Sequence, residues 1–160
     1  MTIKVGDHLP AVTFKVMGEA GPEPRDTDTV FKGKTVVLFG VPGAFTPGCS
    51  RTHLPSYLAQ YDALKAKGVD TIACVSVNDA FVMGAWAKDQ KAEDKILFLA
   101  DGSAEFTKAI GMELDLTAGG LGLRSRRFAM VVKDGVVTAF HPEEGGGITC
   151  SLAGDILPEL

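Results

Sequence analysis

The sequence predicts an α/β protein in which helices cover both faces of a central mixed β-sheet. Three apolar runs, at 35–41, 69–78 and 95–101, indicate buried strands. Helical segments alternate with them, as expected for parallel strands joined by crossover helices. Two further β-rich runs flank Asp134–Gly135, a dipeptide typical of hairpin turns. With 160 residues and no long linker or repeat, we expect a single domain over residues 1–160.

The first part of the chain leads to the first buried strand. Residues 18–34, GEAGPEPRDTDTVFKGK, are rich in turn residues, and we expect a polar connection there. The next run, TVVLFGV at 35–41, is apolar without alternation, which indicates a strand buried on both faces.

A helix is expected after the Pro/Gly stretch, within residues 50–68. Its apolar side chains recur at helical spacing, and Gly68 is expected to end it. Pro55 lies inside this segment and should kink the helix. The apolar positions are Leu54, Leu58, Tyr61 and Leu64.

The rest of the chain continues the alternation of strands and helices. The hairpin at Asp134–Gly135 is expected to lie at one side of the sheet. Its tight turn makes its two strands antiparallel, whereas the other predicted strands are joined by helices. The other expected elements are a strand at 69–78, a helix at 79–90 capped by Asn78 or Asp79, a strand at 95–101, a short helix at 103–111 and a short helix within 149–160.

Composition and charge argue against several classes of function. The formal net charge of −4 disfavours nucleic acid or an anionic membrane as the main partner. No run approaches the roughly 20 apolar residues of a membrane span, and the first residues lack the apolar core of a secretory signal. Three cysteines, with no CxxC pair and no clustered Cys/His spacing, predict neither a disulfide scaffold nor a metal site. A reducing compartment, the cytoplasm, fits best.

The stretch VPGAFTPGCSRTHLP, residues 41–55, places Cys49 where a buried strand passes into a helix. The first helical turn offers unpaired backbone N–H groups and the positive end of the helix dipole. Both favour a thiolate over a thiol. The alternative is a small buried cysteine in an ordinary strand-to-helix turn. Position alone leaves both interpretations open.

The neighbours of Cys49 restrict the backbone in some places and free it in others. Two prolines stiffen the approach, and two glycines allow tight turns and close access to the sulfur. Thr46 is placed either to bring its hydroxyl to the sulfur or to cap the helix. The prolines are Pro42 and Pro47, and the glycines are Gly43 and Gly48.

Pro42, Thr46 and Cys49 form the pattern P-x-x-x-T-x-x-C, which resembles the active-site signature of the peroxiredoxins. The segments CVSVNDAFVMGAW, RRFAMVVKDGVV and GITCSL, in that order, are similar to the atypical two-cysteine (type II, peroxiredoxin 5) branch. The resemblance covers nearly the whole chain. It implies a thioredoxin-like fold and a thiol-dependent peroxidase that reduces hydrogen peroxide and alkyl hydroperoxides.

By this resemblance Cys49 is the peroxidatic nucleophile, which becomes a sulfenic acid on attacking the peroxide. Making a thiol more acidic gains only a few-fold in rate, because the thiolate is then a weaker nucleophile. Most of the acceleration must therefore come from donors aimed at the peroxide oxygens. The candidates are the Thr46 hydroxyl, the backbone N–H groups of Gly48 and Cys49, and an arginine.

Three arginines, in the segment RSRRF, are available as that donor, and spacing does not choose among them. The resemblance selects Arg127, over Arg124 and Arg126, as the guanidinium that holds the thiolate and polarises the peroxide. It also implies that Pro42 shields the sulfur from water. Thr46, Gly48 and Arg127 would then bind the substrate, and no cofactor is implied.

The resemblance also bears on how the sulfenic acid returns to the thiol. Cys150, within a glycine-rich segment, matches the resolving cysteine of members that form an intrachain disulfide. Cys74 matches a position that other members use, but its place within an apolar strand favours a packing role. The third alternative is a one-cysteine type of enzyme, in which an external thiol resolves Cys49. Thioredoxin or glutaredoxin is the implied reductant, and a homodimer is the family's common assembly.

Other interpretations remain open at the level of sequence. His53, four residues after Cys49, suggests either a Cys–His hydrolase pair or a structural histidine, and the structural role is favoured. A redox sensor would use the same Cys49 to oxidise a partner protein. A thioredoxin-like electron carrier is disfavoured by the missing CxxC pair. A non-catalytic interaction module is disfavoured by the complete Pro42, Thr46 and Cys49 set.

Overall fold

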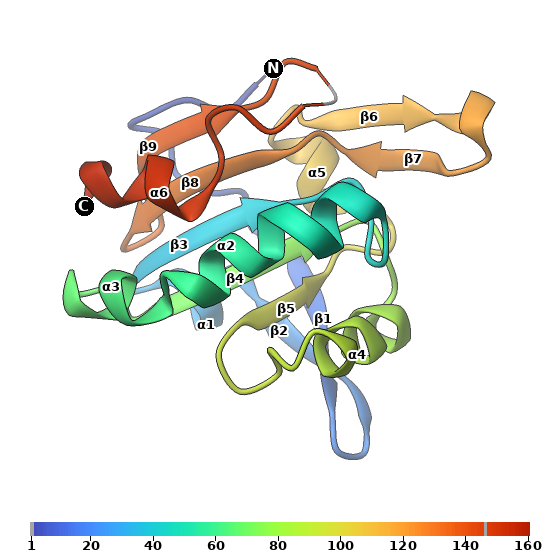
Figure 1. Ribbon diagram of the computed structural model, residues 1–160, viewed down its shortest axis with the longest axis horizontal. Helices are drawn as coiled ribbons and strands as arrows, with labels where there is room; N and C mark the ends of the chain where they lie inside the picture. The colour runs from blue at the N-terminus through green and yellow to red at the C-terminus, as the bar shows by residue number, and fades with distance from the viewer. Residues whose placement is uncertain (1, 146) are drawn as a thin grey trace.

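The computed structural model describes residues 2–145 and 147–160, and its centre is a seven-stranded mixed sheet. The strand order is β2-β1-β5-β4-β3-β8-β9 (Figure 1). The three inner strands are parallel to one another and are β3 (Thr35–Gly40), β4 (Thr71–Ser76) and β5 (Leu97–Ala100). These are the strands that the apolar runs predicted, and they are buried along nearly their whole length.

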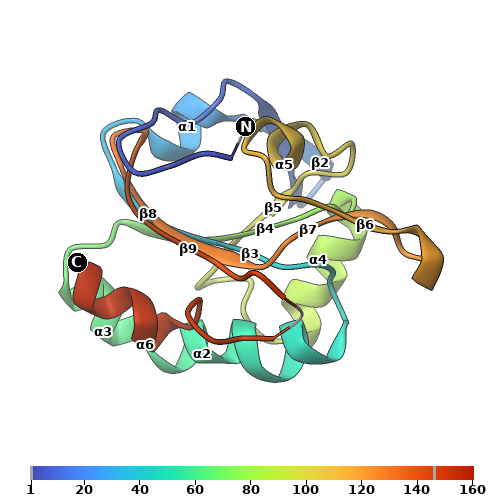
Figure 2. The ribbon, with the colours of Figure 1, turned by 90° about the horizontal axis from the view of Figure 1, so that it is seen from above.

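Helices cover both faces of the sheet, as the sequence predicted (Figure 2). One face carries α1 (Thr27–Phe31) and α5 (Glu105–Ala109), which pack over a core that includes Phe31 and Phe106. The opposite face carries α2 (Leu54–Ala59), α3 (Tyr61–Ala66), α4 (Ala80–Asp89) and α6 (Ala153–Ile156). Short 3-10 turns occur at Thr117–Gly119 and Leu157–Glu159.

The hairpin predicted around Asp134–Gly135 forms one side of the sheet. It joins β8 (Phe128–Lys133) to β9 (Val136–Pro142), and β8 pairs antiparallel with β3. Both turn residues have positive φ, 50° at Asp134 and 80° at Gly135, as a tight turn of the hairpin type requires.

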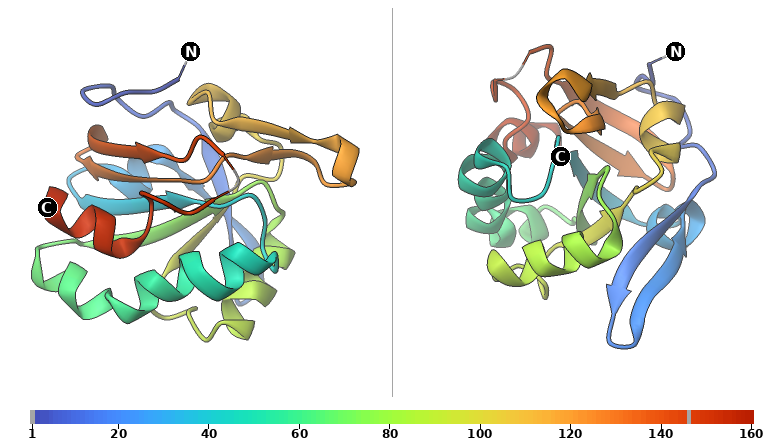
Figure 3. Two further views of the ribbon diagram at one scale, coloured as in Figure 1. Left: turned by 45° about the horizontal axis from the view of Figure 1, so that its top comes forward. Right: turned by 90° about the vertical axis from the view of Figure 1, so that its right-hand side faces the viewer.

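The segment 18–34 departs from the prediction of a polar connection. It contains β2 (Gly21–Asp26) and α1, and β2 pairs antiparallel with β1 (Thr13–Gly18), which was not predicted. Two prolines in β2 concealed the strand, but an edge strand tolerates proline because one of its sides needs no partner. Figure 3 shows this hairpin extending away from the body of the molecule.

The helical region after β3 is interrupted where the sequence placed Pro55. A five-residue π-helical turn, η1 (Cys49–His53), precedes α2, and the Leu54 N–H bonds to the Cys49 carbonyl. Proline has no N–H and crowds the carbonyl four residues earlier, so the wider turn is a local solution to the predicted kink. Gly68 follows α3 with a φ of 90°, as expected for a terminating glycine.

A second, two-stranded sheet was not predicted. It pairs β6 (Glu113–Leu116) with β7 (Gly122–Ser125) and extends from one end of the molecule (Figures 1 and 3). None of the helices in the described parts of the chain is both long and apolar enough to cross a membrane.

Candidate active site

Cys49 is the first residue of η1, beyond the loop that follows the end of β3 at Gly40, and its side chain is fully buried. Two polar groups reach its sulfur. The Thr46 Oγ1 is 2.9 Å from Sγ, and the Arg127 Nη2 is 3.5 Å from it. Helical backbone begins at residue 47, so Gly48 and Cys49 belong to the first turn, whose N–H groups have no acceptor within the helix. The sulfur therefore lies at the start of a helix, within reach of two side-chain donors.

Thr46 has one hydroxyl proton and two acceptors within reach. Its Oγ1 is 2.7 Å from the Gly43 carbonyl oxygen as well as 2.9 Å from the Cys49 sulfur. When Cys49 is a thiol, its S–H can donate to Oγ1 while the hydroxyl donates to Gly43. When Cys49 is a thiolate, the hydroxyl can turn and donate to the sulfur. One side chain thus accommodates both protonation states.

Arg127 immediately precedes β8 and is nearly fully buried. Its Nη2 donates to the Cys49 sulfur, and its Nη1 lies 3.0 Å from His53 Nδ1. The other two arginines bond elsewhere. Arg124 donates to the carbonyls of Leu121 and Pro42, and Arg126 donates to the Glu143 carbonyl.

Gly43 and Gly48 provide space rather than an unusual backbone. Neither has a positive φ; the positive φ in this loop belongs to Phe45, at 66°. A Cβ built at Gly48 would lie 3.1 Å from Arg127 Nη2, and one at Gly43 would lie 2.8 Å from Arg124 Nη1. Close access to the sulfur is met at Gly48, where Arg127 passes, and the chain turns tightly from Gly43 to Thr46, whose N–H bonds to the Gly43 carbonyl.

His53 is fully buried and holds Arg127. A guanidinium has no acceptor, so His53 Nδ1 must accept the bond from Arg127, and the ring proton must be on Nε2. Nε2 then donates to the Ser151 carbonyl, 2.9 Å away. Burial, together with the Arg127 charge, lowers the pKa of His53 to about 3, so the imidazole is neutral.

This role of His53 was not identified from the sequence. The four-residue spacing from Cys49 indicated a shared face, but the interpretation stopped at a structural histidine. The partner that gives the ring its function, Arg127, is 74 residues away. Only the fold brings the two together.

Asn78 and Trp86 form hydrogen bonds to residues on either side of Cys49. Asn78 Oδ1 accepts from the Ala44 N–H at 3.0 Å and from the Ser76 hydroxyl, which fixes the loop that carries Thr46. The helix cap that the sequence assigned to Asn78 or Asp79 is Asp79, whose side chain accepts from Val82 N–H. On the other side, buried Trp86 donates through Nε1 to the Ser50 hydroxyl, 3.0 Å away.

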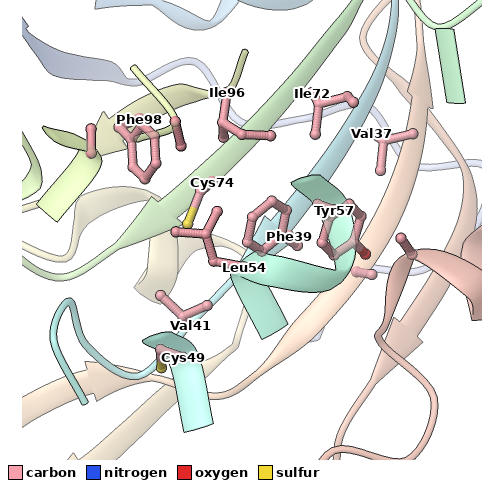
Figure 4. Close-up of a cluster of buried hydrophobic side chains, with 14 of the residues drawn as sticks. Val37, Phe39, Val41, Cys49, Leu54, Tyr57, Ile72, Cys74, Ile96 and Phe98 are labelled. Atoms are coloured by element: carbon pink, nitrogen blue, oxygen red, sulfur yellow. The ribbon is translucent and has the colours of Figure 1, made fainter. Parts of the chain in front are cut away.

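The two other cysteines occupy different surroundings. Cys74 is fully buried on β4, and burial raises its pKa well above the ordinary value. In the view of Figure 4, Val41 and Leu54 lie between it and Cys49. Cys150 is partly exposed, and its Sγ lies 3.5 Å from the Pro142 carbonyl oxygen. Burial and the nearby Glu143 carboxylate raise the pKa of Cys150 as well.

A pocket of about 270 Å³ lies beside Pro42 and Arg127. Its walls combine apolar and charged side chains, and the β6 strand supplies two leucines. The lining residues are Pro42, Leu114, Leu116, Arg126, Arg127, Glu144 and Gly145. Among the described residues, no group of three or more His, Cys, Asp or Glu side chains is arranged to hold a metal ion.

A thioredoxin-like sheet with a cysteine, a threonine and a buried arginine at one helix start defines a class of thiol-based redox proteins, and comparison with known proteins gives the family. The chain matches the Redoxin family over residues 4–153. It is 48% identical to peroxiredoxin-2B of Arabidopsis thaliana, covering 99% of this chain and 98% of that protein. The chain therefore belongs to the peroxiredoxins, which are thiol peroxidases.

Solved structures agree with this assignment. Reduced Prx3 of Vibrio vulnificus in complex with H2O2 is 52% identical, with a TM-score of 0.94 and 98% of each chain covered. Peroxiredoxin 5 of Alvinella pompejana is 39% identical, with a TM-score of 0.87, covering 98% of this chain and 97% of that one. The thioredoxin-like peroxiredoxin fold and the type II resemblance are thus confirmed.

Proposed function

We propose that this peroxiredoxin, a single domain over residues 1–160, reduces hydrogen peroxide and alkyl hydroperoxides through Cys49. The observation that carries the proposal is the placement of one sulfur within reach of the Thr46 hydroxyl and the Arg127 guanidinium, at distances of 2.9 and 3.5 Å. The related Vibrio structure contains H2O2, which supports the same substrate here.

The reaction begins when the Cys49 thiolate attacks one peroxide oxygen. A sulfur–oxygen bond forms, the O–O bond breaks, and the leaving oxygen departs as water or an alcohol after protonation. Negative charge moves from sulfur onto oxygen during this step. Arg127, Thr46 and the N–H of Gly48 are donors already fixed in place, so they stabilise that charge with little reorganisation. Pro42 is half-buried beside them, has no N–H, and shields the sulfur.

The pocket beside Pro42 supports the alkyl hydroperoxide part of the proposal. Leu114 and Leu116 offer an apolar wall within about 270 Å³ of space. An alkyl group could rest there while the hydroperoxide reaches Cys49 past Arg127. Hydrogen peroxide has no such group, so the leucines should affect only the organic substrates.

For the return to the thiol we propose Cys150 as the resolving cysteine, with Cys74 as second choice. Cys150 is partly exposed, whereas Cys74 is fully buried in the core. The resulting Cys49–Cys150 disulfide would be reduced by thioredoxin or glutaredoxin in the cytoplasm. A homodimer is further proposed, since Phe45, in the loop before Cys49, and Phe81, in the first turn of α4, are 51% and 65% exposed.

The test is NADPH-coupled consumption of peroxide with either a thioredoxin or a glutaredoxin system. We expect Cys49→Ser to abolish turnover, Cys150→Ser to lower it strongly, and Cys74→Ser to leave it near the wild-type rate. Continued turnover by Cys49→Ser would overturn the proposal. A Cys49–Cys74 linked peptide after one equivalent of peroxide would transfer the resolving role to Cys74.

A further inference from the structure

The segment that carries Cys150 is bound to one buried carboxylate. We call residues 147–151 the Cys150 segment. Glu143, at the end of β9, is almost completely buried and accepts five hydrogen bonds from this segment. The donors are Thr149 N–H and Oγ1, Cys150 N–H, and Ser151 N–H and Oγ, at 2.7 to 3.1 Å. These bonds hold the pKa of Glu143 at about 2, so the carboxylate is ionised.

The same segment reaches the Cys49 centre through the Ser151 carbonyl. That oxygen accepts from His53 Nε2 at 2.9 Å and from the Tyr57 hydroxyl at 2.8 Å. His53 in turn accepts from Arg127, which donates to the Cys49 sulfur. A continuous series of hydrogen bonds therefore connects Glu143 to Cys49 through Ser151, His53 and Arg127.

The arrangement also determines where the Cys150 thiol points. Its Sγ lies 3.5 Å from the Pro142 carbonyl oxygen, and His141 Nδ1 bonds to the Cys150 carbonyl at 2.8 Å. Cys49 and Cys150 are separate thiols here, and a disulfide requires their sulfurs at about 2.05 Å. A bond from Cys150 to Cys49 would therefore replace the contact of the Cys150 thiol with Pro142. Figure 2 shows the chain that leads into α6 passing alongside α2.

We propose that Glu143 is a positioning residue that acts in opposite directions on the two steps of the reaction. While the Cys150 segment is bound to Glu143, the Ser151 carbonyl keeps His53 and Arg127 in place for peroxide attack. The same binding keeps Cys150 away from Cys49. The resolving step requires these bonds to open, so Arg127 loses its support only after the peroxide has been reduced.

The second half of this inference rests on the proposed role of Cys150. In that step the Cys150 sulfur attacks the Cys49 sulfenic sulfur. The S–S bond forms, the S–O bond breaks, and the hydroxide leaves as water with the proton of the Cys150 thiol. Weakening the attachment to Glu143 should speed this step and slow the first one. A role in general stability would not produce opposite changes.

The experiment is a single-turnover reaction of the full chain with hydrogen peroxide, followed by Trp86 fluorescence. The first phase depends on peroxide concentration and reports attack; the second does not and reports disulfide formation. For Glu143→Gln, a weaker acceptor of the same shape, we expect the first rate to fall about three- to tenfold and the second to rise by a similar factor. Thr149→Val removes one exposed donor. It should lower the first rate and raise the second, each about twofold.

Glu19→Gln is the matched control, because it removes the same charge from an exposed position in the turn between β1 and β2. It should leave both rates unchanged. Rates in Glu143→Gln and Thr149→Val that both match wild type, or that fall together, would overturn the proposal.

A peptide map of the wild type separates this inference from the proposed function. If no Cys49–Cys150 peptide forms, Cys150 is not the resolving residue. The rate of the attack phase alone then tests whether Glu143 is a positioning residue. A slower attack in Glu143→Gln would then still support the positioning role, and an unchanged attack would end it.

Discussion

Arg127 Nη1 lies 3.0 Å from His53 Nδ1, and this contact determines how the guanidinium meets the Cys49 sulfur. In this tautomer the neutral ring accepts at Nδ1. It therefore holds Arg127 without neutralising the positive charge of the guanidinium. The second terminal nitrogen of Arg127 is thereby left to face Cys49. A guanidinium provides this two-point geometry, and an ammonium group does not.

Replacing Arg127 should slow peroxide attack. Arg127→Ala removes the charged donor at the sulfur, and we expect the second-order rate constant to fall more than about tenfold. Arg127→Lys keeps the charge but cannot contact His53 and Cys49 together, so it should recover only part of the loss. Stopped-flow measurement with hydrogen peroxide provides the test. An unchanged rate in Arg127→Ala would remove this residue from the mechanism.

His53 should contribute through Arg127 rather than by proton transfer. His53→Phe leaves the buried Nη1 of Arg127 without its acceptor, and attack should slow about tenfold. His53→Gln keeps one acceptor and one donor, so it should restore most of the rate. If Gln and Phe have equal effects, the hydrogen-bond role is wrong and the ring acts through packing alone.

Local sequence patterns were sufficient for the central strands and for the position of Cys49. The run at 35–41 is apolar on both faces because β3 lies in the middle of the sheet between β4 and β8. Cys49 could be located because a Pro/Gly stretch between a buried strand and a helix is itself a local feature. Thr46 is only three residues away and follows from the same stretch.

Features that depend on distant partners were not accessible in this way. β2 contains two prolines and is recognisable only once β1 is seen to pair with it. The function of His53 depends on Arg127 and on Ser151, 74 and 98 residues away. Nothing in the segment EEGGG distinguishes Glu143 from Glu144. Its role is visible only in the fold, where residues 149–151 donate to its carboxylate. Spacing contains no information about such contacts.

Thr46 should matter through its hydroxyl. Thr46→Val keeps the shape but removes the hydroxyl that reaches both the Cys49 sulfur and the Gly43 carbonyl, and we expect attack to slow about tenfold or more. Thr46→Ser retains the hydroxyl and should stay within a few-fold of wild type. Comparing both rate constants tests this; a Val variant as fast as the Ser variant would contradict it.

Gly48 should be required because Arg127 passes close to it. A methyl group at this position would lie 3.1 Å from Nη2, so Gly48→Ala forces the guanidinium to shift by a few tenths of an ångström. We expect slower attack with little loss of folding stability, because Gly48 already has ordinary helical φ and ψ angles. Gly154→Ala, in α6, is a suitable comparison, since nothing lies within 4 Å of a Cβ there. Equal rates in the two variants would show that the contact is tolerated.

His53 should also make folding stability depend on pH between 7.5 and 5. The folded protein keeps the ring neutral, with a pKa of about 3, whereas the unfolded chain takes up a proton near the ordinary value of 6.5. Acid therefore favours the unfolded state, and the free energy of unfolding should drop by about 2 kcal/mol across this range. Glu143, with a pKa of about 2 against an ordinary 4.5, adds its own loss only at lower pH.

Denaturant titrations of the wild type and His53→Gln at pH 7.5, 6 and 5 would measure this contribution. Glutamine does not titrate, so the variant should be less stable at pH 7.5 but lose about 2 kcal/mol less on acidification. The two curves should therefore converge as the pH falls. Parallel curves would mean that His53 is protonated in the folded protein, and its bond from Arg127 would then have to be abandoned, because a protonated ring has no acceptor.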